Sequence, residues 1–192
     1  MASKDHFRSV ADALQPVVAG VRDDQLDAPS PCSEYTVREL TNHFLGTSEA
    51  MRRLGAGEAR DPEDPWGTGG DYLHGDWRGA LSGQLLGVAD GWSRDEAWDG
   101  MVDDSEMPKQ GAGDMAYVEL VLHGWDLARG TGQQVSYDEA AVAQADEVLD
   151  QIGQMGRDAN IFAPVVEVPD DAPALHKMLA KSGRDPHWSP EA

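Results

Sequence analysis

The sequence contains one cysteine and no long apolar run, and each of these observations excludes a class of protein. Cys32 stands alone among 192 residues, which leaves no disulfide framework and no thiolate metal cluster. No stretch approaches the roughly 18 apolar residues of a membrane span, and the first residues lack the apolar core of a signal peptide. We therefore expect a cytoplasmic protein that no membrane segment anchors.

Basic residues are also scarce. The chain has 15 Lys and Arg, only four of them Lys, against 35 Asp and Glu, for a net charge of -20. Such a chain lacks the positive surface that binds nucleic-acid phosphates or anionic lipids, so we predict neither partner. The acidity fits adaptation to high salt as well as an ordinary acidic cytosolic protein. With 40% hydrophobic residues the chain can still build a core, and we expect it to be globular.

Apolar residues recur at three- and four-residue steps along most of the chain, which predicts helices. Capping boxes at Thr36–Glu39 and Ser136–Glu139 open two of them. The predicted helices are 4–20, 36–54, 72–91, 114–129, 136–155 and a short one at 173–181. We see no alternation of strands and helices.

These segments predict an all-α fold, an antiparallel four-helix bundle with an extra C-terminal helix and a Pro-rich tail. Residues 1–156 are expected to form the bundle and residues 157–192 an extension packed on it, within one domain. Pro16 is expected to kink or shorten the first helix. Asp114, after Gly113, is the expected cap of the fourth helix, which ends where glycines recur at 130–132.

The fourth predicted helix is apolar almost all round, so it belongs inside the bundle rather than on its rim. Its polar exceptions are Glu119, His123 and Asp126, which share one face at i, i+4 and i+7. A carboxylate and an imidazole buried together need partners, because an unpaired buried charge is costly. They form either an ion pair between helices or part of a metal site.

A third ligand is available on the second helix. His43 shares the face of Leu40 and Phe44, so it should point inward. Two histidines and a carboxylate leave a coordination position for water or substrate, as in catalytic zinc sites. The spacing is not the Glu-x-x-His of di-iron bundles, which disfavours a ferritin-like centre. Because core histidines are usually just hydrogen-bonded, spacing alone leaves the ion pair open.

Three segments resemble the DinB-like metal-binding superfamily, in the branch that contains mycothiol-dependent maleylpyruvate isomerase and related uncharacterised metal-binding proteins. The segments are PSPCSEYTVRELTNHFLG (29–46), YVELVLHGWDLARGTGQ (117–133) and LAKSGRDPHW (179–188). The resemblance extends over nearly the whole chain. It implies a four-helix bundle that binds a divalent metal, usually zinc, through three residues, which fall on His43, Glu119 and His123.

The resemblance also implies a chemistry. A metal with an open position can hold a small thiol as its thiolate, ready to attack an electrophile. We therefore expect a transferase or isomerase that acts on a small electrophilic substrate with mycothiol as co-substrate, hydrolysis through metal-bound water being the variant. Asp126 is the catalytic candidate, as a residue that orients a ligand or relays a proton. The alternative is an Asp126 that pairs with Arg129 or Arg38.

Two further functions stay open from the sequence. One is non-catalytic binding of a metal or small ligand, and the other is a metal-free structural or regulatory helical protein. Zinc is the expected metal, with nickel or iron as alternatives, because two imidazoles and a carboxylate suit all three. Cys32 is expected to be a small packed residue rather than a nucleophile. Monomer and homodimer are both compatible with the sequence.

Overall fold

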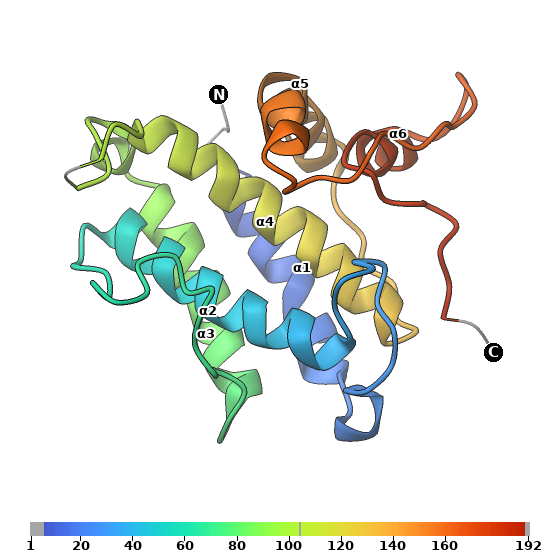
Figure 1. Ribbon diagram of the computed structural model, residues 1–192, viewed down its shortest axis with the longest axis horizontal. Coiled ribbons are helices and arrows are strands. Elements are labelled where there is room, and N and C mark those ends of the chain that lie inside the picture. The colour runs from blue at the N-terminus through green and yellow to red at the C-terminus, as the bar shows by residue number, and fades with distance from the viewer. Residues whose placement is uncertain (1–5, 104, 191–192) are drawn as a thin grey trace.

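The computed structural model describes residues 6–103 and 105–190, and all regular structure in these ranges is helical (Figure 1). The α-helices are α1 (Phe7–Gly20), α2 (Val37–Ala56), α3 (Trp77–Trp92), α4 (Lys109–Gly130), α5 (Glu139–Asp158) and α6 (Ala174–Lys181). Two short 3-10 turns, η1 (Asp23–Gln25) and η2 (Asp95–Trp98), lie in the connections. The predicted all-α fold is confirmed.

Helices α1 to α4 form the bundle. The two helices α3 and α4 lie on opposite sides of it, and each contacts both α1 and α2. In Figure 1, α2 and α4 run in opposite directions, and α5 lies on the other side of α4 from α2. The short helix α6 packs against α5. Helix α4 therefore has neighbours on several sides. The division into residues 1–156 and 157–192 stays a prediction.

The surroundings of α4 explain its composition. From Ala116 to Ala128 every residue except Glu119 is buried. Gly124 lies so close to α1 that a Cβ atom there would come within 2.3 Å of Leu14. The missing side chain lets the two helices approach each other at this level. Helix α4 is therefore an apolar helix inside the bundle, as the sequence predicts.

Helix α4 starts earlier than predicted. It begins at Lys109, so Asp114 lies inside the helix, 4% exposed, and does not cap it. Gly113 was the misleading signal. A Cβ atom at this position would lie 2.5 Å from the Trp98 ring, so this glycine serves close packing rather than a helix end. At the other end Gly132 has φ +69°, the left-handed conformation expected after the helix.

Two other helix starts differ from the prediction, and the end of α1 agrees with it. The cap of α5 is Asp138, whose side chain accepts from Ala141 N at 2.7 Å, so the predicted box at Ser136 is wrong. Asp76 caps α3 in the same way, which starts that helix at Trp77. Helix α1 continues through Pro16 to Gly20, with the proline on its exposed side.

The capping box of α2 is confirmed. Thr36 N donates to Glu39 Oε2 at 2.8 Å, and Glu39 N donates to Thr36 Oγ1 at 3.3 Å. Because both bonds are present, the first turn of α2 is fixed, and with it the face on which the inward residues lie.

The long connection between α2 and α3, residues 57–76, folds back over α2. Asn42 Oδ1 accepts from Tyr72 N at 2.6 Å, and Asn42 Nδ2 donates to Gly70 O at 2.9 Å. Tyr72 donates to Asp64 Oδ2 at 2.5 Å, and this bond raises the pKa of Tyr72 to about 12. The connection thus forms a polar wall beside α2. None of the described helices combines the length and apolar character needed to cross a bilayer.

Candidate metal centre

The three predicted ligands come together where α2 faces α4. His43 lies two turns into α2, next to the fully buried Phe44, and its side chain is 17% exposed. Glu119 and His123 lie one turn apart on the neighbouring face of α4. One ligand atom from each of the three residues fits in a group whose members all lie within 4.8 Å of one another. The helical spacing in the sequence is therefore realised in space.

Glu119 lies between the two imidazoles. Its Oε2 atom is 3.6 Å from His43 Nε2 and 3.3 Å from His123 Nε2. Metal–nitrogen and metal–oxygen bonds of about 2.0–2.1 Å at tetrahedral angles separate neighbouring ligand atoms by about 3.3 Å. The observed distances match that separation, so the donor set fits a small divalent cation.

The same oxygen gives a second test of the fit. Glu119 Oε2 is buried, and no hydrogen bond from the described residues satisfies it. Buried polar atoms are nearly always hydrogen-bonded, so one that is not calls for a ligand, an ion or a bound water. A cation held by Glu119 and the two Nε2 atoms would satisfy this oxygen.

Asp126 orients His123. Its carboxylate is completely buried, and Asp126 Oδ2 lies 3.0 Å from His123 Nδ1. The carboxylate can only accept, so Nδ1 carries the proton and Nε2 presents its lone pair toward Glu119. A carboxylate behind a histidine in this way fixes the ring and its tautomer for metal binding.

Arg184 holds Asp126 from the C-terminal tail. Arg184 Nε donates to Asp126 Oδ1 at 3.2 Å, and Nη2 donates to Asp126 Oδ2 at 2.8 Å. The alternative pairing of Asp126 with Arg129 or Arg38 is wrong, because Arg129 donates to the Trp188 carbonyl and Arg38 to Asp27. Sequence reasoning missed Arg184, although it lies in the third segment of resemblance.

The charges of the site follow from these contacts. Burial alone would raise the pKa of Asp126, but Arg184 and His123 outweigh it, and the pKa lies below its usual range. Burial likewise opposes ionisation of Glu119, and the interaction with His123 and His43 brings its pKa below the usual value. When the two imidazoles are neutral, as metal ligands must be, two carboxylates and one guanidinium leave a net negative charge for a divalent cation to neutralise.

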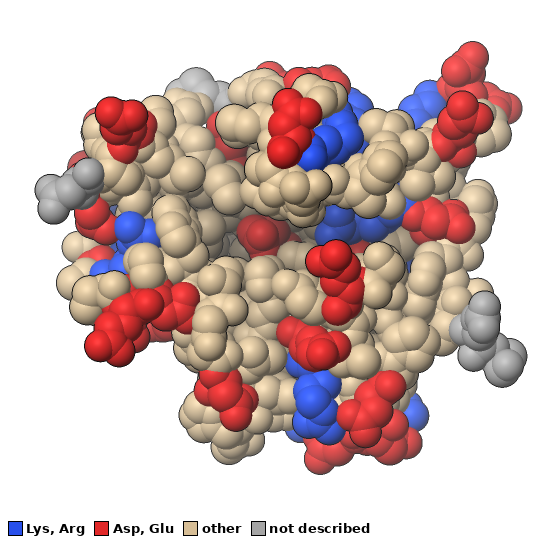
Figure 2. Space-filling model, in the orientation of Figure 1, with Lys and Arg blue, Asp and Glu red and all other residues tan. Residues whose placement is uncertain are grey.

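Two cavities lie beside His43, and both have His43 and Tyr35 in their walls. The larger, about 740 Å³, lies between α4, α5, residues 159–164 and the loop before α2, and contains all three ligands. Figure 2 shows the molecule hollowed here, between the surfaces of α5 and α2. The smaller, about 500 Å³, lies between α2 and the connection 57–76. Solvent and small molecules could therefore reach a metal held by His43, Glu119 and His123 through these cavities.

Cys32 lines the larger cavity, but its chemistry does not suit a nucleophile. Burial, and then the charge of Asp126, raise the pKa of its thiol above the usual value. Nucleophilic cysteines need a lowered pKa, because the thiolate is the reactive form. The raised pKa therefore disfavours Cys32 as the nucleophile of this site.

The chain is similar to proteins of one sequence family. The sequence model of the family described as the mycothiol maleylpyruvate isomerase N-terminal domain matches residues 7–128. Two uncharacterised proteins of Mycobacterium tuberculosis, MT0763 of strain CDC 1551 and Rv0738 of strain H37Rv, are each 29% identical over 175 residues. The alignments cover 90% of this chain and 92% of each relative. No solved structure matches the chain.

Proposed function

The chain belongs to the mycothiol maleylpyruvate isomerase N-terminal domain family, and from this membership we propose that it is a metal-dependent, thiol-dependent enzyme. It would bind a divalent cation and a low-molecular-weight thiol of the mycothiol type. The reaction would be transfer of the thiol to a small electrophile, or isomerisation of that electrophile. The metal-binding, mycothiol-related character comes from the family, and the activity is our proposal.

One observation carries the proposal. A buried carboxylate oxygen, Glu119 Oε2, lies between two imidazole nitrogens at 3.3 and 3.6 Å, on the floor of an open cavity, and accepts no hydrogen bond of ordinary geometry from the described residues. A metal-free ion pair also accounts for the distances, but a cation held between the three groups accounts for the distances and for the absent hydrogen bond together. His43, Glu119 and His123 are therefore the proposed ligands.

The residues of the chain have distinct proposed roles. A divalent cation, zinc first and nickel or iron as alternatives, would supply the positive charge that favours the thiolate over the thiol. Glu119 and the two histidines hold that charge at the cavity floor. Asp126 fixes the ring and tautomer of His123 and does not line the cavity, which favours orientation over proton relay. Arg184 keeps Asp126 in place and ionised.

Metal analysis of the purified protein tests the ligand set. We expect about one zinc per chain after equilibration with zinc and dialysis, and loss of that metal in His43→Ala. His74→Ala is the matched control, because His74 is exposed on the connection 57–76, and it should keep the metal. A zinc-replete wild-type protein that retains no metal would leave the structural or regulatory alternative.

Calorimetric titration with mycothiol tests the thiol. The metal-loaded protein should bind it, and the metal-free protein should bind it at least tenfold more weakly, because the thiolate loses its counter-charge. If the loaded protein does not bind mycothiol at millimolar concentration, the thiol hypothesis is wrong. A non-catalytic metal-binding protein or a hydrolase would then account for the site.

A further inference from the structure

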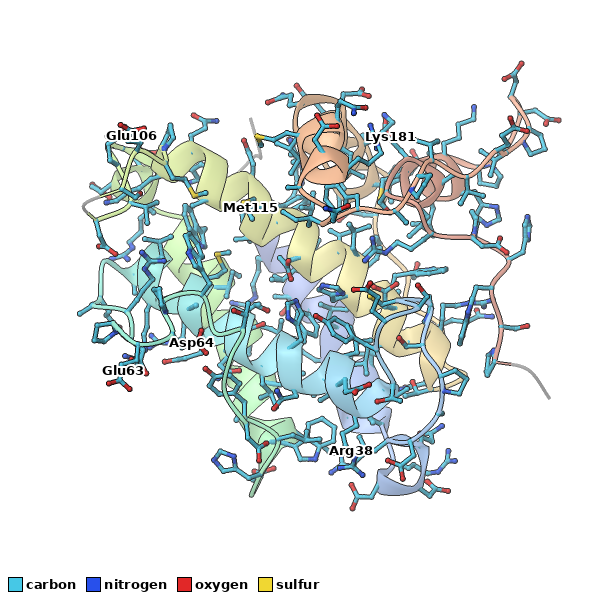
Figure 3. All side chains as sticks on the ribbon, in the orientation of Figure 1. Arg38, Glu63, Asp64, Glu106, Met115 and Lys181 are labelled. Carbon is cyan, nitrogen blue, oxygen red and sulfur yellow. The ribbon has the colours of Figure 1, made fainter. Side chains whose placement is uncertain are left out.

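The two cavities beside His43 differ in chemistry. The smaller one is lined by polar side chains of α2 and the connection 57–76, among them Arg38, Asn42 and Asp71. The larger one has one wall that is almost entirely apolar. Arg38 on α2 and Met115 on α4, both labelled in Figure 3, lie in the walls of the smaller and the larger cavity respectively.

The apolar wall comes from several separate segments. Met107 and Met115 lie before and in α4, Ile152 and Met155 in α5, and Phe162 in the segment that follows α5. Methionine side chains are flexible and polarisable, so they adapt to apolar ligands of different shape. Met155 is 64% exposed, which places part of this wall at the mouth of the cavity.

Apart from the proposed metal, the charged side chains of the larger cavity leave no unpaired cation for an anion within the described part of the chain. Its carboxylates are Glu34 and Glu119, and Arg184 is the one Lys or Arg that lines it within the described part of the chain. The Nε and Nη2 atoms of Arg184 are bonded to Asp126, and Nη1 donates to the Ser182 carbonyl at 3.3 Å. A carboxylate on a ligand would lose its hydration here without gaining a free cation in the apolar wall.

Resting on the function proposed above, we propose that the larger cavity is the subsite for the electrophile and that it takes an uncharged, largely apolar molecule. A volume of about 740 Å³ is in the range of small-molecule sites, roughly 300–1,000 Å³. The wall of Met115, Ile152 and Phe162 holds the apolar body, with the reacting carbon toward Glu119 and His123. A dicarboxylate such as maleylpyruvate would be a poor ligand for this chain.

The reaction that follows is a substitution when the electrophile is an aryl or alkyl halide. The thiol sulfur forms a bond to the carbon, and the carbon–halogen bond breaks with its electron pair leaving on the halide. The thiol proton passes to water. The thiol is the only co-reactant, and no oxidant or reductant is needed.

The test uses two unreactive molecules that differ by one charge, dinitrobenzene and dinitrobenzoate. Both are titrated by calorimetry into the full chain as purified and after metal removal. We expect dinitrobenzene to bind at least tenfold more tightly than dinitrobenzoate in the metal-free form, because there the carboxylate is desolvated without a partner. Binding needs neither metal nor thiol, so the result is separate from that for the proposed function.

A charge placed in the wall sharpens the test. Met155→Arg puts a free cation at the mouth of the cavity and should shift the ratio toward dinitrobenzoate by about tenfold or more. Met101→Arg is the matched control, because Met101 is 48% exposed and does not line the cavity. It should leave the ratio unchanged, and circular dichroism verifies that both variants fold.

The outcomes separate the two proposals. In the metal-free form, equal affinity for the two molecules, preference for dinitrobenzoate, or no binding of either overturns the apolar subsite. Preference for dinitrobenzene in a protein that binds no metal supports the subsite and contradicts the proposed function instead. As a catalytic readout on the loaded protein, chlorodinitrobenzene should be conjugated to mycothiol faster than chlorodinitrobenzoate, after correction for the uncatalysed rates.

Discussion

Two clusters of charged side chains use similar residue types in opposite surroundings. The surface cluster joins Glu49, Arg52, Arg53 and Glu58 at the end of α2, and each carboxylate oxygen accepts from a guanidinium. The buried cluster joins His43, Glu119, His123, Asp126 and Arg184 between α2, α4 and the tail. There one oxygen, Glu119 Oε2, accepts no hydrogen bond from the described residues.

The difference shows which charges carry information about function. The acids visible in Figure 2 spread over the surface, where water solvates them and each pair adds little. In the buried cluster no side chain is more than 21% exposed, so every charge needs a partner, and a buried atom that accepts no hydrogen bond calls for a ligand, an ion or a bound water. Of 35 acidic residues, the functional argument depends on Glu119 and Asp126.

The largest expected change in the free energy of unfolding comes from breaking the buried ion pair between Asp126 and Arg184. Arg184→Met leaves the Asp126 carboxylate completely buried with one partner fewer. We expect the free energy of unfolding to fall by about 3–5 kcal/mol, measured by urea denaturation. Adding Asp126→Asn to this variant should recover part of the loss, because it removes the uncompensated charge. A loss below about 1 kcal/mol in Arg184→Met would mean that the pair contributes no more than a surface one.

The next effect is that of the metal on stability. At a free zinc concentration of one hundred times the dissociation constant, the folded protein should gain about 2.7 kcal/mol, seen as a higher Tm in thermal unfolding. A chelator should reverse the gain. His43→Ala should unfold at the same temperature with and without zinc, whereas His74→Ala should respond like the wild type. An equal response of all three proteins would place the metal elsewhere.

A smaller effect is expected at the capping box that starts the ligand helix α2. Thr36→Ala removes the hydroxyl that accepts from Glu39 N, and should lower the free energy of unfolding by about 1 kcal/mol. Thr68→Ala, exposed on the connection 57–76, is the control with the same chemical change and should be neutral. The zinc stoichiometry should stay at one in both variants, which separates a loss of stability from a loss of the site.

The smallest effect should come from the surface cluster. Glu58→Gln removes one of the two carboxylates that bond Arg52, with Glu58 about half exposed. We expect a change below about 1 kcal/mol in the free energy of unfolding, and a smaller one at high salt. A loss as large as that in Arg184→Met would remove the distinction between the two clusters.

Several features could be predicted because they depend on local spacing. The three- and four-residue period predicts the helices, and the all-round apolar character of α4 predicts its place inside the bundle. Glu119 and His123 share a face because residues four apart in a helix always do. His43 follows from the same argument on α2, where the Thr36 box also fixes the start of the helix. The three ligand candidates could therefore be predicted without knowing the structure of the loops.

Other features depended on contacts between distant segments. Gly113 looks like a helix end in the sequence, yet it is a packing position against Trp98. The partner of Asp126 is Arg184, which lies 58 positions away on the tail. No periodicity relates these residues, because only the packing of the tail against α4 and α5 brings the guanidinium to the carboxylate. The apolar cavity likewise exists only once α4, α5 and the segment after α5 surround the same space. Local spacing decides which face of a helix a side chain occupies, and tertiary packing decides what that face meets.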